Sequence, residues 1–282
     1  MKKAVQQLML GKVIKSEEQA SHVLEQIAFS GYDSIELNGY MIRKTPAFVR
    51  ILTAAAGMPA GRGGAFDWAA LTRGARLSVA GIHEDLDTLK QSPEAVIRKA
   101  KELGTDRIIL TGMYRFDYTD PAAMRTLCQD LNRCGRIFAE EKIALLYHNH
   151  NIELSRLRDS GERAYLFLIR NTDPDALNFE FDSYWFADAG ADAAEWMRIL
   201  GKRMYAWHIN DRGARIKRIP LTPIVKEDSI ELGYGNLPLE KWATIVKENG
   251  TDTVILESHR NHIDGDPLKS IRLSAAFINR IF

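Results

Sequence analysis

The feature that most constrains this sequence is the alternation of short apolar runs with longer amphipathic segments. The apolar runs are Ala4–Leu10, Ser34–Leu37, Leu77–His83, Arg107–Thr111, Ile143–Tyr147, Leu177–Phe181, Met204–Ile209 and Thr253–Leu256. Helical patterns between them include Ser16–Ser30, Ser92–Leu103, Pro121–Glu141, Glu162–Asn171, Ala191–Leu200 and Pro238–Glu248. Strands that alternate with helices indicate βαβ units and a parallel sheet. Eight such units in 282 residues predict an α/β fold, a single (β/α)8 TIM barrel over residues 1–282 with parallel strands and extended βα loops.

The composition narrows the class of protein further. The formal net charge is +1, and hydrophobic residues make up 45% of the chain, as in an ordinary globular protein with a large core. Near-neutral charge argues against a nucleic-acid binder, which usually carries a basic excess. No run approaches the roughly 20 apolar residues of a membrane-spanning helix, and the N-terminus does not resemble a signal peptide. Cys128 and Cys134 are expected to be reduced, and the expected location is the cytoplasm.

Two connections are longer than a minimal barrel needs. They are Arg43–Arg76, which contains the Gly-rich stretch GMPAGRGGAFDW, and Arg212–Gly235. Long insertions on such scaffolds are often binding loops or lids. The sequence leaves open whether these two serve binding or are plain surface excursions.

Polar residues gather where the predicted strands end, which is where barrels of this kind place their active sites. Most of the seven histidines fall at or just after strand ends. The polar residues at these positions are Glu36, Asn38, His83, Glu84, Asp85, His148, Asn149, His150, Glu153, Asp182, His208, Asn210, Asp211, Glu257, His259, Arg260 and His262. Carboxylates and imidazoles converging on one rim suit a divalent cation such as Mn, Mg, Co or Zn. The competing interpretation for any single Asp is that it caps the next helix.

Several segments resemble those of a known protein family. FEFDSYWFADAG, YAWHINDR and VILESHR resemble the corresponding strands of the xylose isomerase-like sugar isomerase and epimerase barrels. The resemblance runs over essentially the whole chain, with the segments in the family's order. It implies that Asp182, His208 and Glu257 are ligands of one divalent metal ion, most naturally Mn, with Mg, Co or Zn as alternatives.

The fourth metal ligand is where the sequence departs from the family's pattern. The family ends its fifth strand with Glu, whereas this chain reads IALLYHNHNIEL and has His148 at that position. Two interpretations follow: Glu153 completes the metal site, or His148 binds the metal directly. The first is favoured slightly, and it leaves His148 or His150 for acid–base chemistry. Alternation along a strand puts these two imidazoles on the same side.

A metal-bound keto-sugar defines the expected chemistry. Polarising the carbonyl acidifies the neighbouring C–H, so a nearby base can remove the proton and return it elsewhere. The sequence therefore predicts a sugar isomerase or epimerase, a small-molecule carbohydrate substrate and an oligomeric state. The expected catalytic residues are His148, His150, Glu153 and Glu257, and the expected substrate-binding residues are Glu36, His83, Arg115, Asn210 and His259.

Three alternatives remain at this point. QQLML, NGYMIR, SVAGIHEDL and HNHNIEL are similar to segments of the α subunits of bacterial C-glycoside deglycosidases. That resemblance implies a lyase that cleaves 3-keto-C-glucosides by β-elimination and pairs with a small β subunit. An endonuclease IV-like repair enzyme would use the same barrel, but it needs more metal ligands and a basic DNA-binding face. A barrel that only binds a partner would hold no metal at its rim.

Overall fold

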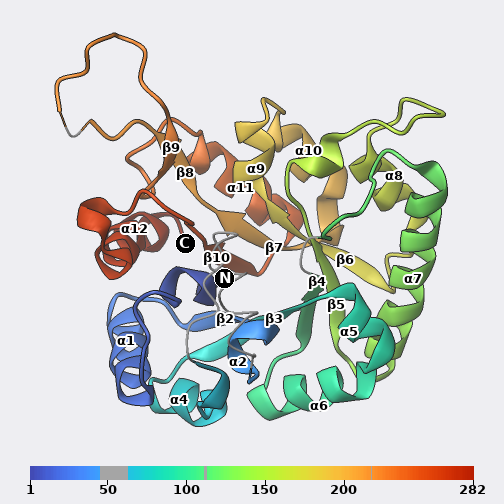
Figure 1. The fold of residues 1–282 in the computed structure, drawn as a ribbon, viewed down its shortest axis with the longest axis horizontal. Coiled ribbons are helices and arrows are strands. Elements are labelled where there is room, and N and C mark those ends of the chain that lie inside the picture. The colour runs from blue at the N-terminus through green and yellow to red at the C-terminus, as the bar shows by residue number, and fades with distance from the viewer. Residues whose placement is uncertain (45–62, 111–112, 217) are drawn as a thin grey trace. The chain divides into compact units, whose positions relative to one another are not determined.

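The computed structural model describes residues 1–44, 63–110, 113–216 and 218–282. Within these residues, eight parallel strands follow one another in a closed barrel with the order β1-β10-β7-β6-β5-β4-β3-β2 (Figure 1). Their bounds are β1 Lys2–Gln6, β2 Ser34–Asn38, β3 Ser78–Glu84, β4 Arg107–Leu110, β5 Ala144–His148, β6 Leu177–Asp182, β7 Met204–Ile209 and β10 Thr253–Leu256. The predicted (β/α)8 barrel is confirmed, and its strands were recognisable because strands buried on both faces read as apolar runs.

The helices that connect the strands follow the predicted pattern. Their bounds are α1 Glu17–Phe29, α2 Gly39–Ile42, α4 Trp68–Gly74, α5 Leu86–Gln91, α6 Pro93–Leu103, α7 Pro121–Glu140, α8 Ala164–Asn171, α9 Ser183–Asp188, α10 Ala193–Leu200, α11 Leu239–Asn249 and α12 Pro267–Ile281. The Ser16 hydroxyl caps α1 by accepting from the Gln19 N–H at 3.2 Å. Gly104 ends α6 in the left-handed region, with φ 69°. None of the helices in the described part of the chain is both long and apolar enough to cross a bilayer.

The end of the first strand was predicted wrongly. It was expected to run to Leu10, but β1 stops at Gln6 and Gln7–Leu10 forms a 3-10 turn. The Gln6 side chain accepts a hydrogen bond from the Leu8 N–H at 3.0 Å, which caps that turn. The apolar residues after Gln6 misled the prediction, because hydrophobicity alone does not separate a buried strand from a buried turn.

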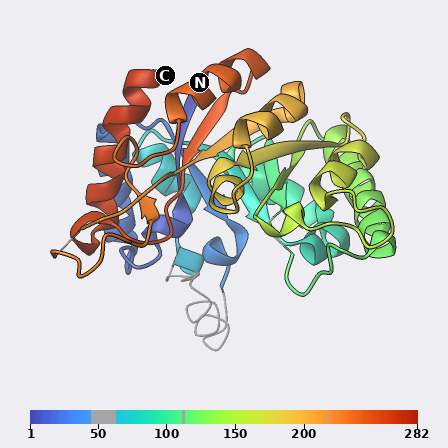
Figure 2. The ribbon, with the colours of Figure 1, turned by 90° about the horizontal axis from the view of Figure 1, so that it is seen from above.

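The chain divides into two compact units. Unit 1 comprises Met1–Ala80, His208–Thr244 and Thr253–Phe282, and unit 2 comprises Gly81–Trp207 and Ile245–Asp252. In unit 1, β1 pairs in parallel with β2 and β10, so that Gln6 faces Glu36 and Val5 faces Leu256. Helix α1 packs against α4 and α12, which Figures 1 and 2 show in blue, cyan and red.

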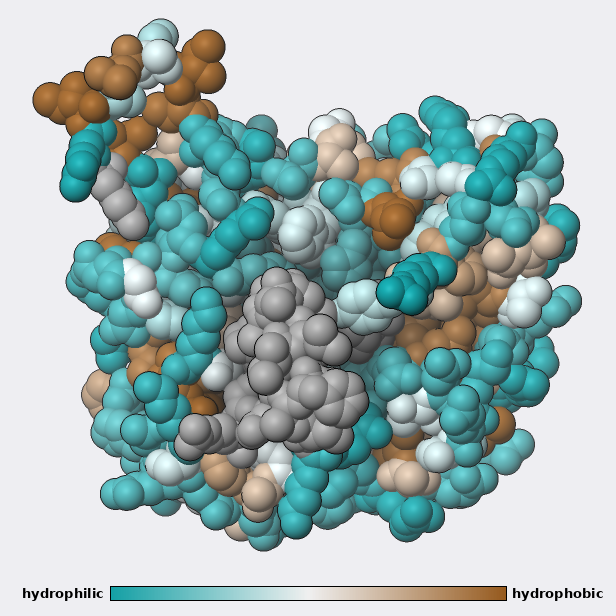
Figure 3. All heavy atoms as spheres, viewed as in Figure 1, coloured by the Kyte–Doolittle hydropathy of each residue, from teal (hydrophilic) through white to brown (hydrophobic). Residues whose placement is uncertain are grey.

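The long connection Arg212–Gly235 in unit 1 contains a small hairpin. Its strands, β8 Asp211–Gly213 and β9 Asp228–Ile230, pair in antiparallel fashion. The loop between them carries strongly exposed apolar side chains, among them Ile219 and Leu221. Figure 3 shows a group of hydrophobic side chains in brown at its upper left, where Figure 1 draws this loop. The other long connection falls largely at residues 45–62, which lie outside the described residues.

Unit 2 holds β4, β5, β6 and the part of β3 from Gly81 onward side by side. Each pairs in parallel with the next, and His148 at the end of β5 faces Glu180 on β6. Helix α7 packs on β5 and β6 and buries both cysteines, which are free thiols. At Gly135 the helix approaches the loop before β6 so closely that an added Cβ would clash with the carbonyl oxygen of Ala176.

Candidate active site

In unit 1, the imidazole of His208 lies between two carboxylates at the strand ends. Its Nδ1 is 3.0 Å from Glu257 Oε2, and its Nε2 is 2.8 Å from Glu36 Oε2. All three side chains are buried. We call Glu36, His208 and Glu257 the His208 group. A charged group costs free energy to bury unless it is paired, so this arrangement suits either a protonated imidazole or a shared cation.

The N-terminal strand positions Glu36 through a glutamine. Gln6 Nε2 donates to Glu36 Oε2 at 3.0 Å, while Gln6 Oε1 accepts from Asn38 Nδ2 at 2.6 Å. The next residue, Gln7, accepts from the Asn38 backbone N–H at 2.8 Å. These two glutamines fix the end of β2, and Gln6 and His208 contact the same carboxylate oxygen of Glu36. Neither glutamine was among the predicted site residues, because both lie within the predicted apolar strand Ala4–Leu10.

In unit 2, two imidazoles share one carboxylate. Glu180 Oε2 lies 3.0 Å from His148 Nδ1 and 3.1 Å from His83 Nε2. The two imidazole rings meet edge to face with their centroids 5.3 Å apart. Together with Asp182, these residues form what we call the His148 group. Glu180 was not among the predicted site residues, although its position two residues before Asp182 puts both on the same face of β6.

Asp182 serves two purposes at the end of β6. Its Oδ1 caps α9 by accepting from the Tyr184 N–H at 2.8 Å, which is the structural role that the sequence offered as the alternative. Its Oδ2 lies 4.0 Å from His148 Nε2. Asn149 holds the Asp182 backbone with its side-chain amide, through bonds of 2.9 and 3.0 Å. The capping role therefore leaves a second carboxylate oxygen beside His148.

Glu153 has a different set of partners from those expected of a metal ligand. Its Oε1 accepts from the Tyr147 hydroxyl at 2.8 Å, and its Oε2 accepts from the His150 backbone N–H at 2.9 Å. Tyr118 extends this network through a 2.9 Å contact between the two tyrosine hydroxyls. Burial raises the pKa of Glu153, although the hydrogen bonds from Tyr147 and His150 act in the opposite direction. Both oxygens are thus used in holding the loop that carries His150.

The remaining predicted substrate residues fall at different places. In unit 1, Asn210 is buried and accepts from the Ser229 hydroxyl at 3.1 Å, and His259 Nε2 lies 3.7 Å from Glu257 Oε2. In unit 2, Arg115 is exposed and has a left-handed backbone, with φ 55°. His259 is the one that directly adjoins the His208 group.

The donor chemistry of both groups fits a divalent metal ion. Among the described residues, buried His, Asp and Glu side chains that could hold a metal ion occur at strand ends in each unit. Imidazole nitrogen and carboxylate oxygen bind borderline and hard cations, including Zn, Mn and Mg. A ligating imidazole also commonly bonds a carboxylate through its other nitrogen, as His208 and His148 do here.

Comparison with known proteins identifies the family. The family model described as xylose isomerase-like TIM barrel matches residues 24–281, so the chain belongs to this family. The resemblance inferred from the three strand segments is thereby confirmed. No curated protein sequence matches the chain.

Solved structures share the fold at low sequence identity. A sugar phosphate isomerase/epimerase from Parabacteroides distasonis ATCC 8503 superposes with a TM-score of 0.77 at 20% identity, covering 98% of this chain and 93% of that one. An L-ribulose 3-epimerase gives a TM-score of 0.67 at 16% identity, covering 100% and 94%. A xylose isomerase-like TIM barrel protein from Mycobacterium smegmatis in complex with magnesium gives 0.64 at 13% identity, covering 99% and 95%.

Proposed function

We propose that this protein is a divalent-metal-dependent enzyme that isomerises or epimerises a keto-sugar by enolisation. The observation that carries the proposal is the set of buried imidazoles and carboxylates at the strand ends, centred on His208 in one unit and on His148 in the other. Membership of the xylose isomerase-like family supports it. The epimerase and isomerase functions named for structural neighbours point to the same chemistry.

The proposed metal ligands are His148, Asp182, His208 and Glu257. Each offers one buried donor atom at a strand end, two of them in each unit. We favour His148 over Glu153 as the fourth ligand because both oxygens of Glu153 already accept hydrogen bonds. Mn is the expected ion, and the magnesium in one structural neighbour supports a divalent cation in general. The bound ion would supply Lewis-acid polarisation of the substrate carbonyl.

The chain's own groups then have to move one proton. We propose His150 as one base, because its ring is only partly buried and its backbone is fixed by Glu153. Imidazole is the side-chain group most often used to take and return a proton near neutral pH. Glu257 is the proposed partner, and His83 and His259 are the proposed contacts of the substrate hydroxyls. Removal of the proton beside the carbonyl and its return to the other face give an epimer, while its return to the neighbouring carbon gives an isomer.

Solvent exchange tests the proposal directly. The purified protein, loaded with Mn, would be incubated in deuterium oxide with a panel of keto-sugars and 3-keto-C-glucosides. We expect deuterium at the carbon beside the carbonyl, abolished by a chelator and reduced about 100-fold in Glu257→Gln. His22→Gln is the matched control, because His22 lies on the exposed face of α1 and contacts Gln26. Absence of exchange with every metal and sugar would overturn the proposal, and release of a phenol would establish the lyase instead.

A further inference from the structure

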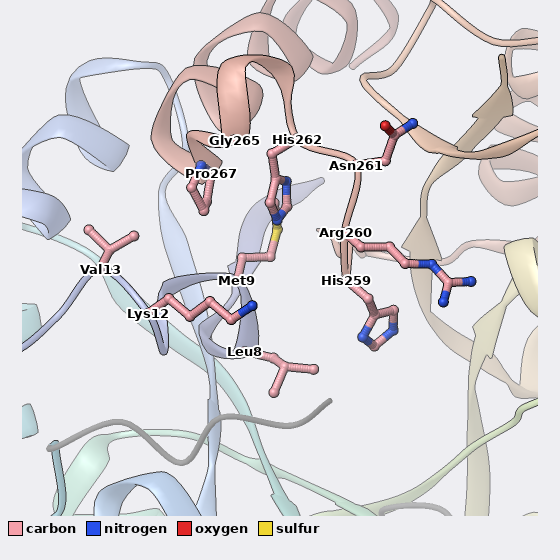
Figure 4. Close-up of a pocket in the computed structure, with 10 residues that line it drawn as sticks. All are labelled: Leu8, Met9, Lys12, Val13, His259, Arg260, Asn261, His262, Gly265 and Pro267. Atoms are coloured by element: carbon pink, nitrogen blue, oxygen red, sulfur yellow. The ribbon is translucent and has the colours of Figure 1, made fainter. Parts of the chain in front are cut away.

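A basic hollow adjoins the His208 group within unit 1. It has a volume of about 450 Å³. Figure 4 shows its walls, which come from the turn after β1 and from the loop between β10 and α12. Its charged or titratable lining residues are Lys12, His259, Arg260 and His262, and no carboxylate lines it among the described residues.

The orientation of these side chains separates those that can reach a ligand from those that cannot. In Figure 4, the Lys12 amine and the His262 ring point into the same space, with His259 at its other side. Arg260 is directed away, and its Nε donates to Asp228 at 2.9 Å. Nδ1 of His262 is buried and has no hydrogen-bond partner in the described structure. A buried polar atom without a partner costs free energy, so this nitrogen is suited to a ligand.

Two carboxylates near the hollow are engaged by other groups. Asp266 caps α12 by accepting from the Leu268 N–H at 2.9 Å, and Glu231 is bound by Arg215 and Ser270. Because Asp266 occupies the helix N-terminus, the anion-binding groups are the side chains rather than the helix end. TIM barrels frequently bind phosphate at the loops that follow the last strands. The hollow lies after β10, the strand that Glu257 directly follows.

We propose that this hollow binds the phosphate group of the substrate, so that the enzyme acts on a sugar phosphate. Lys12 contributes the charge, and His262 and His259 contribute hydrogen bonds. His259 connects the two sites, because its Nε2 lies 3.7 Å from Glu257. A substrate anchored at Lys12 by its phosphate presents its carbon chain toward the His208 group. This inference rests on the proposed function for the sugar part of the ligand, but the phosphate site stands on the hollow alone.

Binding of inorganic phosphate tests the site without turnover. Equilibrium binding would be measured in low salt and without divalent metal for the wild-type protein, Lys12→Met and His262→Asn. We expect the wild-type protein to bind phosphate, and each substitution to weaken binding at least ten-fold. Lys15→Met is the matched control, because Lys15 is exposed and does not line the hollow, and it should bind as the wild type does. Failure of the wild type to bind, or undiminished binding by Lys12→Met, would overturn the proposal.

Competition then distinguishes phosphate from carboxylate ligands. A hexose phosphate, the same hexose and its sugar acid would each be used to displace bound phosphate. Displacement by the hexose phosphate ahead of the other two supports a phosphorylated substrate. Stronger displacement by the sugar acid would show that the site prefers a carboxylate, and the assignment of a phosphate site would then be wrong. Because no metal or catalysis is involved, a failure of the enolisation assay leaves this result unaffected.

Discussion

The Nδ1 atom of His208 lies 3.0 Å from a carboxylate oxygen of Glu257, at the ends of β7 and β10. The opposite nitrogen of the same ring contacts Glu36 at 2.8 Å. A buried imidazole with a carboxylate on each side is well suited to exchange one of these contacts for a metal ion while the other orients the ring. Because His208 contacts both carboxylates, we expect its removal to affect metal binding most directly.

Substitution of His208 by Asn should remove the bound metal. Loss of the imidazole takes away a proposed ligand and leaves Glu36 and Glu257 as buried carboxylates without their common partner. We expect the affinity for Mn to fall by at least about 100-fold, the upper end of the effect of losing a residue that supports a metal ligand. Metal content after dialysis, measured by mass spectrometry, checks this. His22→Asn should retain wild-type metal content, and an unchanged content in His208→Asn would contradict the ligand assignment.

The identity of the fourth ligand can be decided by a pair of variants. Because Glu153 is engaged by Tyr147 and His150, Glu153→Gln should keep its metal, whereas His148→Asn should lose it. Competition between the protein and a fluorescent Mn chelator gives the two affinities. The reverse result, with metal lost from Glu153→Gln and kept by His148→Asn, would restore Glu153 as the ligand. Near-UV circular dichroism of both variants would show that the comparison concerns folded proteins.

Close packing at Gly135 predicts a loss of stability without any chemistry. A Cβ at this position would clash with the backbone carbonyl of Ala176, which cannot move as a flexible side chain could. Gly135→Ala should lower the free energy of unfolding by about 1–3 kcal/mol, as overpacking does. Urea unfolding measures it. In the control Gly74→Ala, the added methyl meets nothing within 4 Å, so helix propensity should leave that variant as stable as the wild type or slightly more so.

Much of this architecture could be predicted from the sequence because the signals are local. The barrel strands are buried on both faces, so they appear as short apolar runs, and caps such as Ser16 mark the helix starts. Asp182, His208 and Glu257 could be chosen as candidate metal ligands because each stands at the end of such a run, in a segment that resembles the family's. The remaining contacts join residues far apart in the chain. Glu180 became a candidate only once His83 and His148 were seen on either side of it.

The basic hollow is a clearer example of contacts that the sequence alone does not reveal. Lys12 belongs to the turn that follows β1, and His262 to the loop that precedes α12, with nearly the whole chain between them. No spacing rule links two such positions. The wrong prediction of a strand as far as Leu10 made the hollow harder to predict. That strand would replace the turn that brings Lys12 to the hollow. Side-chain contacts between distant segments therefore had to come from the structure.

The acid side of the stability curve should depend on Glu231. Burial alone would raise the pKa of Glu231, but the hydrogen bond from Ser270 at 2.5 Å and the Arg215 guanidinium outweigh it, and the net direction is down. A pKa that is lower in the folded state stabilises the protein above the unfolded-state pKa, and this contribution is lost as pH falls through the folded-state pKa. Glu231→Gln should therefore cost about 1–3 kcal/mol near neutral pH, with the difference from wild type shrinking in acid. Urea unfolding, measured at a series of pH values from neutral into acid, gives this difference. Glu240→Gln is the control, because Glu240 is exposed, and it should leave the pH dependence unchanged. A difference that stays constant with pH would show that Glu231 acts through packing rather than through its charge.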